Sequence, residues 1–222
     1  MSVEGKAAEV TKLGGRGATR EDILSVATHE FAATGFRNTD VQVIADKLGI
    51  GKATIYRAFG TKEQLFFAAV DQGMQSLNEV MLEHHECSEE LEPSEKMRRT
   101  LFRFLSYFDQ HQELIELLIQ ERSEFRDREP NSYTRNWLVN SPRWQKNCLE
   151  AIEKGRFREV AVEGLVNMFS SICYGAIFTH YFSKQKMDLQ STAALMADVM
   201  TYGLISDEAR EKHAPKTRTT QG

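Results

Sequence analysis

Residues 51–62 carry the side chains of this chain that are best suited to hold phosphate groups. They include Lys52, Thr54, Tyr56, Arg57 and Lys62. Lysine and arginine neutralise phosphates, and hydroxyl groups donate hydrogen bonds to phosphate oxygens. Arginine can also bond the edge of a guanine through two hydrogen bonds. The segment therefore predicts contacts with DNA rather than catalysis on a small substrate.

These side chains need a frame of two helices joined by a tight turn, and residues 41–59 have that pattern. Ala45 is small where the two helices would cross closely, and Gly49 tolerates the positive φ that the turn requires. Asp40 is a good N-cap for the first helix. The second helix, Lys52–Phe59, would enter the major groove. Apolar residues occupy the positions that face the core: Ile44, Leu48, Ile50, Ile55 and Ala58. A helical hairpin with a glycine turn and no role in DNA binding has the same spacing, but the basic outer face favours DNA.

The run from Gly35 to Leu65 resembles the N-terminal domain of the TetR family of transcriptional regulators. The matching positions are residues 35–41, 44–45, 48–57, 59 and 62–65. The resemblance covers roughly residues 19–66. It implies an all-α protein with a three-helix helix-turn-helix DNA-binding domain at 19–66. A larger helical domain for effector binding and dimerisation would follow at 67–206. A flexible arm at 1–18 would precede the DNA-binding domain, and a polar tail at 207–222 would follow the larger domain.

In such a domain Tyr56 and Lys62 would each hold a phosphate, and Arg57 with Thr54 would read bases. Thr39 would touch the DNA backbone at the start of the second helix. Other interpretations remain: Tyr56 as half-buried packing, Thr39 as a cap only, and Lys62 as an ordinary solvated residue. The predicted DNA-binding residues are Arg20, Thr39, Asp40, Val41, Gly51, Lys52, Ala53, Thr54, Tyr56, Arg57 and Lys62. Gly51, Ala53 and Ala58 depart from the residues common in the family.

The rest of the chain also predicts helices. Only 4 of 222 residues are proline, and long stretches lack both proline and glycine. Thr19 with Asp22, and Thr61 with Gln64, are capping boxes for the helices that follow them. Further helices are expected from Ser94, over 114–125, after a cap and proline at Ser141-Pro142, over 160–182 and over 189–205. Residues 83–93 are expected to form a connection, and residues 126–140 an irregular segment.

Charge and cysteine usage indicate a cytoplasmic protein. Residues 1–66 carry 9 Lys and Arg against 8 Asp and Glu, whereas the remaining residues carry 19 against 24. The basic excess is small, so it permits DNA binding without establishing it. The 3 cysteines form no CxxC pair, which suits a reducing compartment. No signal peptide is evident, and Glu163, Asn167 and His180 interrupt the most apolar segment, so we expect no membrane partner.

The last two long helices predict a homodimer. The first of them is apolar over more than one face, which calls for burial against a partner as well as in its own core; a purely intrachain core is the alternative. The predicted interface residues are Phe169, Ile172, Ala176, Met196, Val199 and Met200. An effector pocket for an apolar or aromatic small molecule would be lined by Phe104, Phe108, Trp137, Trp144, Phe169 and Cys173, although these residues also suit an ordinary core.

Other sites are not expected. The run His84-His85-Glu86-Cys87 offers metal-ligating atoms, but adjacent helical residues point apart and no second cluster has metal-site spacing. We expect no metal, no cofactor and no catalytic residues, and so no enzyme. The leading hypothesis is a repressor that binds double-stranded operator DNA and is released by a small-molecule effector. The alternative is a helical DNA-associated assembly protein with no effector.

Overall fold

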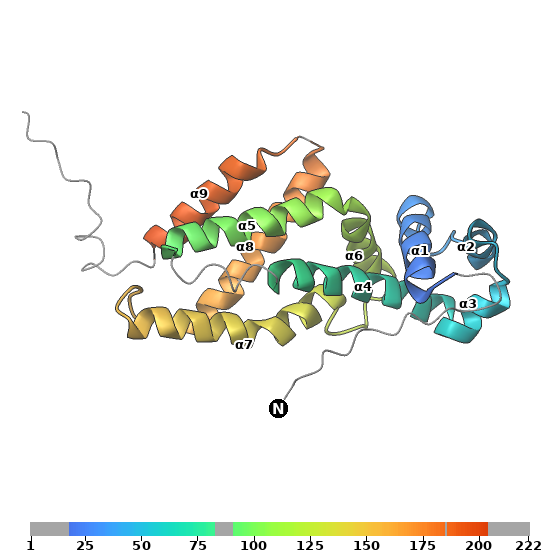
Figure 1. The fold of residues 1–222 in the computed structure, drawn as a ribbon, viewed down its shortest axis with the longest axis horizontal. Coiled ribbons are helices and arrows are strands. Elements are labelled where there is room, and N and C mark those ends of the chain that lie inside the picture. Colours follow the sequence, from blue (N-terminus) through green and yellow to red (C-terminus); the bar gives the residue numbers. More distant parts are fainter. Residues whose placement is uncertain (1–17, 83–90, 185, 204–222) are drawn as a thin grey trace, which may run out of the picture. The chain divides into compact units, whose positions relative to one another are not determined.

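The computed structural model describes residues 18–82, 91–184 and 186–203, and the regular elements in them are helices (Figure 1). Their bounds are α1 Arg20–Thr34, α2 Val41–Leu48, α3 Lys52–Phe59, α4 Lys62–Leu82, α5 Pro93–Gln110, α6 Gln112–Glu124, α7 Ser132–Glu153, α8 Val162–Ser183 and α9 Leu189–Tyr202. The all-α fold with an N-terminal helix-turn-helix is confirmed. Residues 1–17 of the predicted arm, the run 84–87 and the predicted tail lie outside the described residues.

The chain forms two compact units. Among the described residues, the first contains 18–76 together with 111–133, and the second contains 77–82, 91–110, 134–184 and 186–203. Helices α1, α2 and α3 therefore share a unit with most of α4 and with the whole of α6. This unit extends beyond the predicted domain at 19–66, because a helix distant in sequence packs on its first helix.

The short helices begin and end at residues that the sequence marks. Thr19 accepts a hydrogen bond from the backbone of Asp22, whose carboxylate accepts one from the backbone of Thr19, so the capping box before α1 is confirmed. Asp40 caps α2 by accepting from the backbone N–H of Gln42 at 2.9 Å. Gly49 ends α2 at φ 63°, a left-handed conformation that favours glycine.

Aromatic rings form the centre of the first unit. Phe31 of α1 meets Phe66 of α4 edge to face, with their ring centroids 5.2 Å apart. Phe125, at the end of α6, lies with its ring centroid 5.6 Å from that of Phe66. The buried Gln120 of α6 donates its Nε2 hydrogen to the carbonyl of Phe31 at 2.8 Å. Helix α6 is thus joined to α1 and α4 through both ring contacts and a buried hydrogen bond.

Helix α7 corrects the sequence-based expectation. Ser141 and Pro142 were expected to begin a helix after an irregular segment, but α7 begins at Ser132 and contains Pro142 in its interior. A proline inside a helix leaves the carbonyl four residues earlier without its usual donor. That carbonyl belongs to Leu138, and it accepts a hydrogen bond from the hydroxyl of Ser141 at 3.3 Å. Ser141, which was expected to be a cap, instead donates to the Leu138 carbonyl that Pro142 leaves without a backbone donor.

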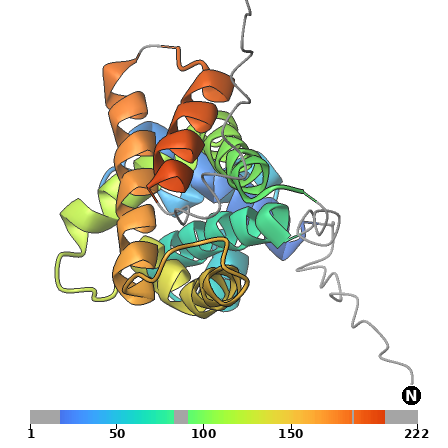
Figure 2. The ribbon, with the colours of Figure 1, turned by 90° about the vertical axis from the view of Figure 1, so that its left-hand side faces the viewer.

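In the second unit, α5 packs along α9 and also contacts α8. Figure 2 shows α8 and α9 as neighbouring helices joined by a short connection. The core of this unit is aliphatic and aromatic, with buried residues on all three helices: Leu101, Leu105, Phe108, Leu165, Val166, Phe169, Ala193, Ala197 and Met200. His180 of α8 lies 3.2 Å from the carboxylate of Asp109 on α5.

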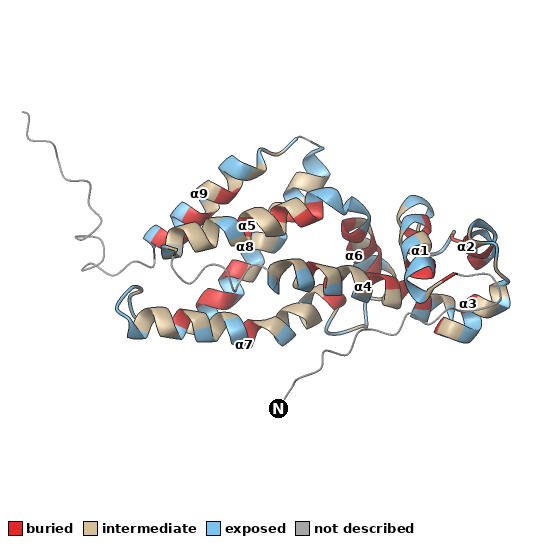
Figure 3. Cartoon of the chain, in the orientation of Figure 1, coloured by how far each residue is buried: buried red, intermediate tan, exposed pale blue. Residues whose placement is uncertain are grey.

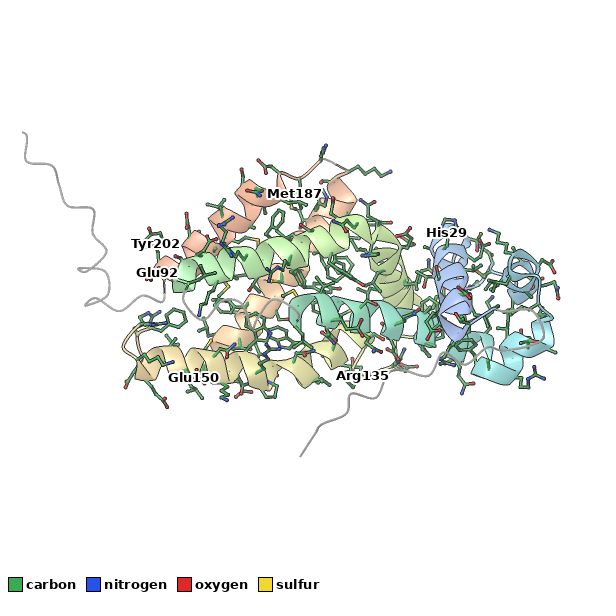
Figure 4. All side chains as sticks on the ribbon, viewed as in Figure 1. His29, Glu92, Arg135, Glu150, Met187 and Tyr202 are labelled. Atoms are coloured by element: carbon green, nitrogen blue, oxygen red, sulfur yellow. The ribbon has the colours of Figure 1, made fainter. Side chains whose placement is uncertain are left out.

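Figure 3 shows exposed residues along α8 and α9. Several of these exposed residues are large and apolar. Leu195 and Val199 of α9 are 66% and 67% exposed, and Tyr202 projects from the end of the same helix (Figure 4).

Among the described residues, α8 is also long and apolar enough to cross a membrane by length and composition, contrary to expectation. Core helices of soluble proteins pass the same test, so this is weak evidence for a span.

Candidate nucleic-acid interface

The turn between α2 and α3 is fixed by backbone hydrogen bonds. The N–H of Ile50 donates to the carbonyl of Ala45 at 3.1 Å, and the N–H of Thr54 donates to the carbonyl of Gly51 at 2.8 Å. Ala45 is fully buried. The turn therefore fixes the direction in which α3 leaves α2, and with it the orientation of the outer face of α3.

Helix α3 has one buried face and one exposed face. Ile55 and Phe59, four residues apart, are buried in the first unit. Ala53, Tyr56 and Arg57 are exposed and recur at spacings of three and four, so they share the opposite face of the helix. Ile55 and Phe59 anchor α3 in the core. The hydroxyl of Tyr56 and the guanidinium of Arg57 therefore lie on its exposed face.

Lys52 is already paired at the start of α3. Its Nζ lies 2.8 Å from Oδ1 of Asp40, the residue that caps α2. The hydrogen bond from Lys52 holds the pKa of the Asp40 carboxyl below its usual range, and the same bond raises the pKa of Lys52. The Lys52 ammonium also lies 6.0 Å from the centroid of the Tyr56 ring. The pair links the beginning of α2 to the beginning of α3.

Lys62 is the first residue of α4 and lies between Thr61 and Gln64, which form the predicted capping box. The hydroxyl of Thr61 accepts from the backbone of Gln64 at 3.1 Å, and the Gln64 side chain accepts from the backbone of Thr61 at 3.0 Å, so the box is confirmed. Lys62 donates its Nζ hydrogen to the carbonyl of Arg37 at 3.0 Å. Partial burial lowers its pKa, while the nearby carboxylate of Asp40 opposes that shift.

Arg20 joins α1 to α3. Its guanidinium lies 4.2 Å from the centroid of the Phe59 ring and donates to the carbonyl of Ala58 at 3.4 Å. The side chain remains exposed, so its positive charge stays near the end of α3.

Two predicted DNA-binding residues, Thr39 and Val41, have buried side chains in this structure. The hydroxyl of Thr39 donates to the carbonyl of Gly35 at 2.8 Å and lies 2.7 Å from the hydroxyl of Thr34. Val41 is part of the core beneath α2. In the free protein both side chains position the end of α1 and the start of α2. Neither side chain lies on the exposed surface of the helix-turn-helix.

The loop between α1 and α2 holds two residues to which the sequence assigned no role. Phe36 lies beneath the Lys62 ammonium, with its ring centroid 4.9 Å from Nζ. Arg37 is exposed, and its Nε lies 2.6 Å from a carboxylate oxygen of Glu124 at the end of α6. Both residues belong to the run 35–41 that resembles the TetR family, but their partners are distant in the chain, so no sign of these contacts was present in the sequence.

The predicted pocket and interface residues are spread over several helices of the second unit. Phe104 and Phe108 of α5 lie with ring centroids 5.1 Å apart. Burial raises the pKa of the Cys173 thiol to about 12. Trp137 and Trp144 are half-buried on α7. Phe169 and Met200 are buried within the protomer, whereas Ile172 and Val199 are exposed and Ala176 and Met196 are half-buried.

Residues 23–69 match the model of a protein family described as bacterial regulatory proteins, tetR family. An uncharacterized HTH-type transcriptional regulator of Bacillus subtilis, YhgD, is 34% identical over 106 residues, which are 46% of this chain and 52% of that protein. The probable acrEF/envCD operon repressor of Escherichia coli K12 is 30% identical over 111 residues, 49% of this chain and 50% of the repressor. The matched segment thus spans about half the length of these relatives.

The fold extends further than the sequence match. The structure of the fatty acid degradation regulator FadR from Bacillus halodurans superposes with a TM-score of 0.71, covering 85% of this chain and 97% of FadR at 17% sequence identity. At that identity the likeness concerns the fold. It includes the helices beyond residue 69, where the family model no longer matches.

Proposed function

We propose that this chain, a TetR-family transcriptional regulator, is a repressor that binds operator DNA as a homodimer and is released by a small-molecule effector. Regulators of this family bind operator DNA, typically as dimers, and typically respond to small molecules. The observation that carries the proposal is the exposed face of α3, where Tyr56 and Arg57 stand opposite the buried Ile55 and Phe59. This exposed face supports the role of a regulator over that of an enzyme, and the proposed repressor would act in the cytoplasm.

On the DNA, α3 would lie in the major groove. Arg57 and Thr54 would read base edges, and Gly51 and Ala53 would lie beside the groove. Tyr56 and Lys62 would each contact a phosphate on either side of the groove. The sequence-specific part of the affinity would come from α3, and the salt-dependent part from the flanking cations.

Three predicted residues would act mainly through their neighbours. Thr39 and Val41 would hold the start of α2, and Asp40 would hold Lys52. Arg20 would supply charge beside α3 and could reach the adjacent phosphate. For Thr39 and Val41 this role follows from burial, and a buried hydroxyl that already donates to a carbonyl has no hydrogen left for a phosphate. For the exposed Asp40 it follows from the hydrogen bond with Lys52.

The homodimer would form through α8 and α9. The apolar side chains that these helices expose would be removed from water by burial against a second copy. Of the residues predicted for the interface, Ile172 and Val199 would contribute directly, with the half-buried Ala176 and Met196 beside them. Phe169 and Met200 would support this face from the core of each protomer.

The effector would bind in the second unit and be apolar or aromatic. Aromatic residues occur on α5, α7 and α8 of that unit, and they suit an apolar or aromatic ligand. Its predicted lining is Phe104, Phe108, Trp137, Trp144, Phe169 and Cys173.

Selection of bound fragments from a random DNA library would supply the operator, and a compound screen for its release would then supply the effector. The variant carrying both Tyr56→Ala and Lys62→Ala should bind that operator at least about tenfold more weakly at fixed salt while remaining a folded dimer. Lys146→Ala removes an exposed lysine of α7 and serves as the control. Unchanged operator affinity of the double variant would contradict the proposal. Operator binding that no compound releases would favour an assembly protein.

A further inference from the structure

The ammonium group of Lys62 does not hold its position alone. It rests on the loop between α1 and α2, where Nζ donates to the carbonyl of Arg37 at 3.0 Å and lies 4.9 Å from the centroid of the Phe36 ring. A lysine side chain has four flexible bonds, so its charge is placed by what it contacts. The location of this charge therefore depends on where the loop holds Phe36 and Arg37.

That loop is held by the end of α6. Phe125, which follows the last residue of α6, lies with its ring centroid 4.8 Å from that of Phe36. Glu124 accepts a hydrogen bond from Nε of Arg37 at 2.6 Å. The Arg37–Glu124 pair involves an exposed guanidinium, so water and salt weaken it. The contact between the Phe36 and Phe125 rings also holds the loop, together with the contacts of Phe36 with Phe31 and Phe66, whose ring centroids lie 6.0 Å and 5.3 Å away.

The end of α6 is in turn held by contacts with α4 and with the residues that precede α7. The ring of Phe125 lies 4.7 Å from that of Phe67, measured between centroids, and the guanidinium of Arg128 lies 3.5 Å from the centroid of Phe67. Arg128 also pairs with Glu121 of α6 at 3.0 Å, and Glu121 is almost completely buried. The backbone N–H and the hydroxyl of Ser132, the first residue of α7, both donate to the carboxylate of Glu121. A continuous set of contacts therefore leads from Lys62 to the first turn of α7.

We propose that Phe125, at the end of α6, is a positioning residue for DNA binding, which acts through Phe36 to hold the Lys62 ammonium where it meets a phosphate. This inference rests on the proposed DNA-binding function. A cation that is held in place before binding loses less side-chain freedom when the phosphate arrives, so the contact is stronger. Movement of the end of α6 would displace the loop, and the phosphate contact would weaken.

A double-mutant cycle tests the inference. Phe125→Leu keeps an apolar side chain but removes the ring that contacts Phe36, and Lys62→Ala removes the cation. Affinity for the selected operator would be measured by fluorescence anisotropy at one salt concentration for the intact protein, both single variants and the double variant. Phe125→Leu should weaken binding by about three- to tenfold in the intact protein and by less than about twofold in the Lys62→Ala background.

Leu117→Val controls for lost stability, because Leu117 is a fully buried residue of α6 with no part in the proposed contact. Its affinity should stay within about twofold of the intact protein while its melting temperature falls. Additive losses for Phe125→Leu and Lys62→Ala, or an equal loss for Leu117→Val, would overturn the inference while leaving the proposed function intact. A chain that selects no DNA at all would contradict both.

Discussion

The Nζ of Lys52 lies 2.8 Å from Oδ1 of Asp40, so a cation at the start of α3 is paired within the free protein. The same carboxylate caps α2 through the backbone N–H of Gln42. One side chain thus begins a helix and holds the lysine of the next helix. The arrangement places a negative charge on the proposed DNA-binding face and offsets it with a neighbouring positive one.

Asp40→Asn should free Lys52 to pair with phosphate while leaving α2 capped, because asparagine is an equally good N-cap. The plot of log affinity against log salt concentration should become steeper by about one, and affinity for unrelated DNA should rise. Asp46→Asn is the matched control, since it removes the same charge from an exposed position of α2 where the carboxylate accepts from Gln42. An equal change in the salt slope of both variants would mean that the Lys52 pair has no special role.

Gly73→Ala should destabilise the first unit by about 1–3 kcal/mol. A Cβ on Gly73 would lie 2.7 Å from Cδ1 of Leu114, and that leucine is buried on α6 and has little room to move. Denaturant unfolding measures the cost. Gly164→Ala, on α8, is the control, because its Cβ would meet nothing within 4 Å. Similar unfolding free energies for the two variants would show that α4 and α6 do not pack closely at this point.

Glu95 should give the second unit a stability that depends on pH. Hydrogen bonds from Arg98 and then Arg99 lower the pKa of this carboxyl from 4.5 to about 2. A carboxyl whose pKa is lower in the folded protein stabilises it fully above the unfolded value and loses that contribution as the pH falls through the folded value. The difference in unfolding midpoint between the intact protein and Glu95→Gln should therefore shrink between about pH 4.5 and pH 2. A difference that stays constant across this range would contradict the prediction.

Val199→Glu should separate the proposed dimer into folded monomers. Val199 is 67% exposed, so the carboxylate would disturb the proposed contact with a second copy and leave the core of each chain intact. Size-exclusion chromatography with light scattering at micromolar concentration gives the mass, and circular dichroism checks the helices. Leu138→Glu, at an exposed position of α7, should remain a dimer. A dimeric Val199→Glu, or a monomeric intact protein, would exclude this interface.

Local sequence signals predicted the helix-turn-helix well. Thr19, Asp40 and Thr61 each begin a helix as expected, and Gly49 and Gly60 follow the ends of α2 and α3. Caps and positive-φ glycines act within a few residues, so their effect can be read from one stretch of sequence. The exposed face of α3 followed from the same spacing.

Contacts between distant residues were beyond such reasoning. Ser141 and Pro142 have the composition of a helix start, and only the satisfied carbonyl of Leu138 explains why α7 continues through them. The link between Phe36 and Phe125 joins residues far apart in the chain, and neither residue carries a local sign of its partner. Burial of Thr39 was likewise hidden, because its partners belong to the end of α1.

Selection from a random DNA library with the intact protein and with Arg57→Ala tests most directly whether α3 reads bases. The intact protein should enrich a site of two inverted half-sites, since two copies related by a two-fold axis present α3 twice. Arg57→Ala should lose the preference at one position of each half-site, at a cost of about 1–3 kcal/mol, and keep its affinity for unrelated DNA. Enrichment of no shared sequence by the intact protein, or of an unchanged sequence by Arg57→Ala, would contradict the account.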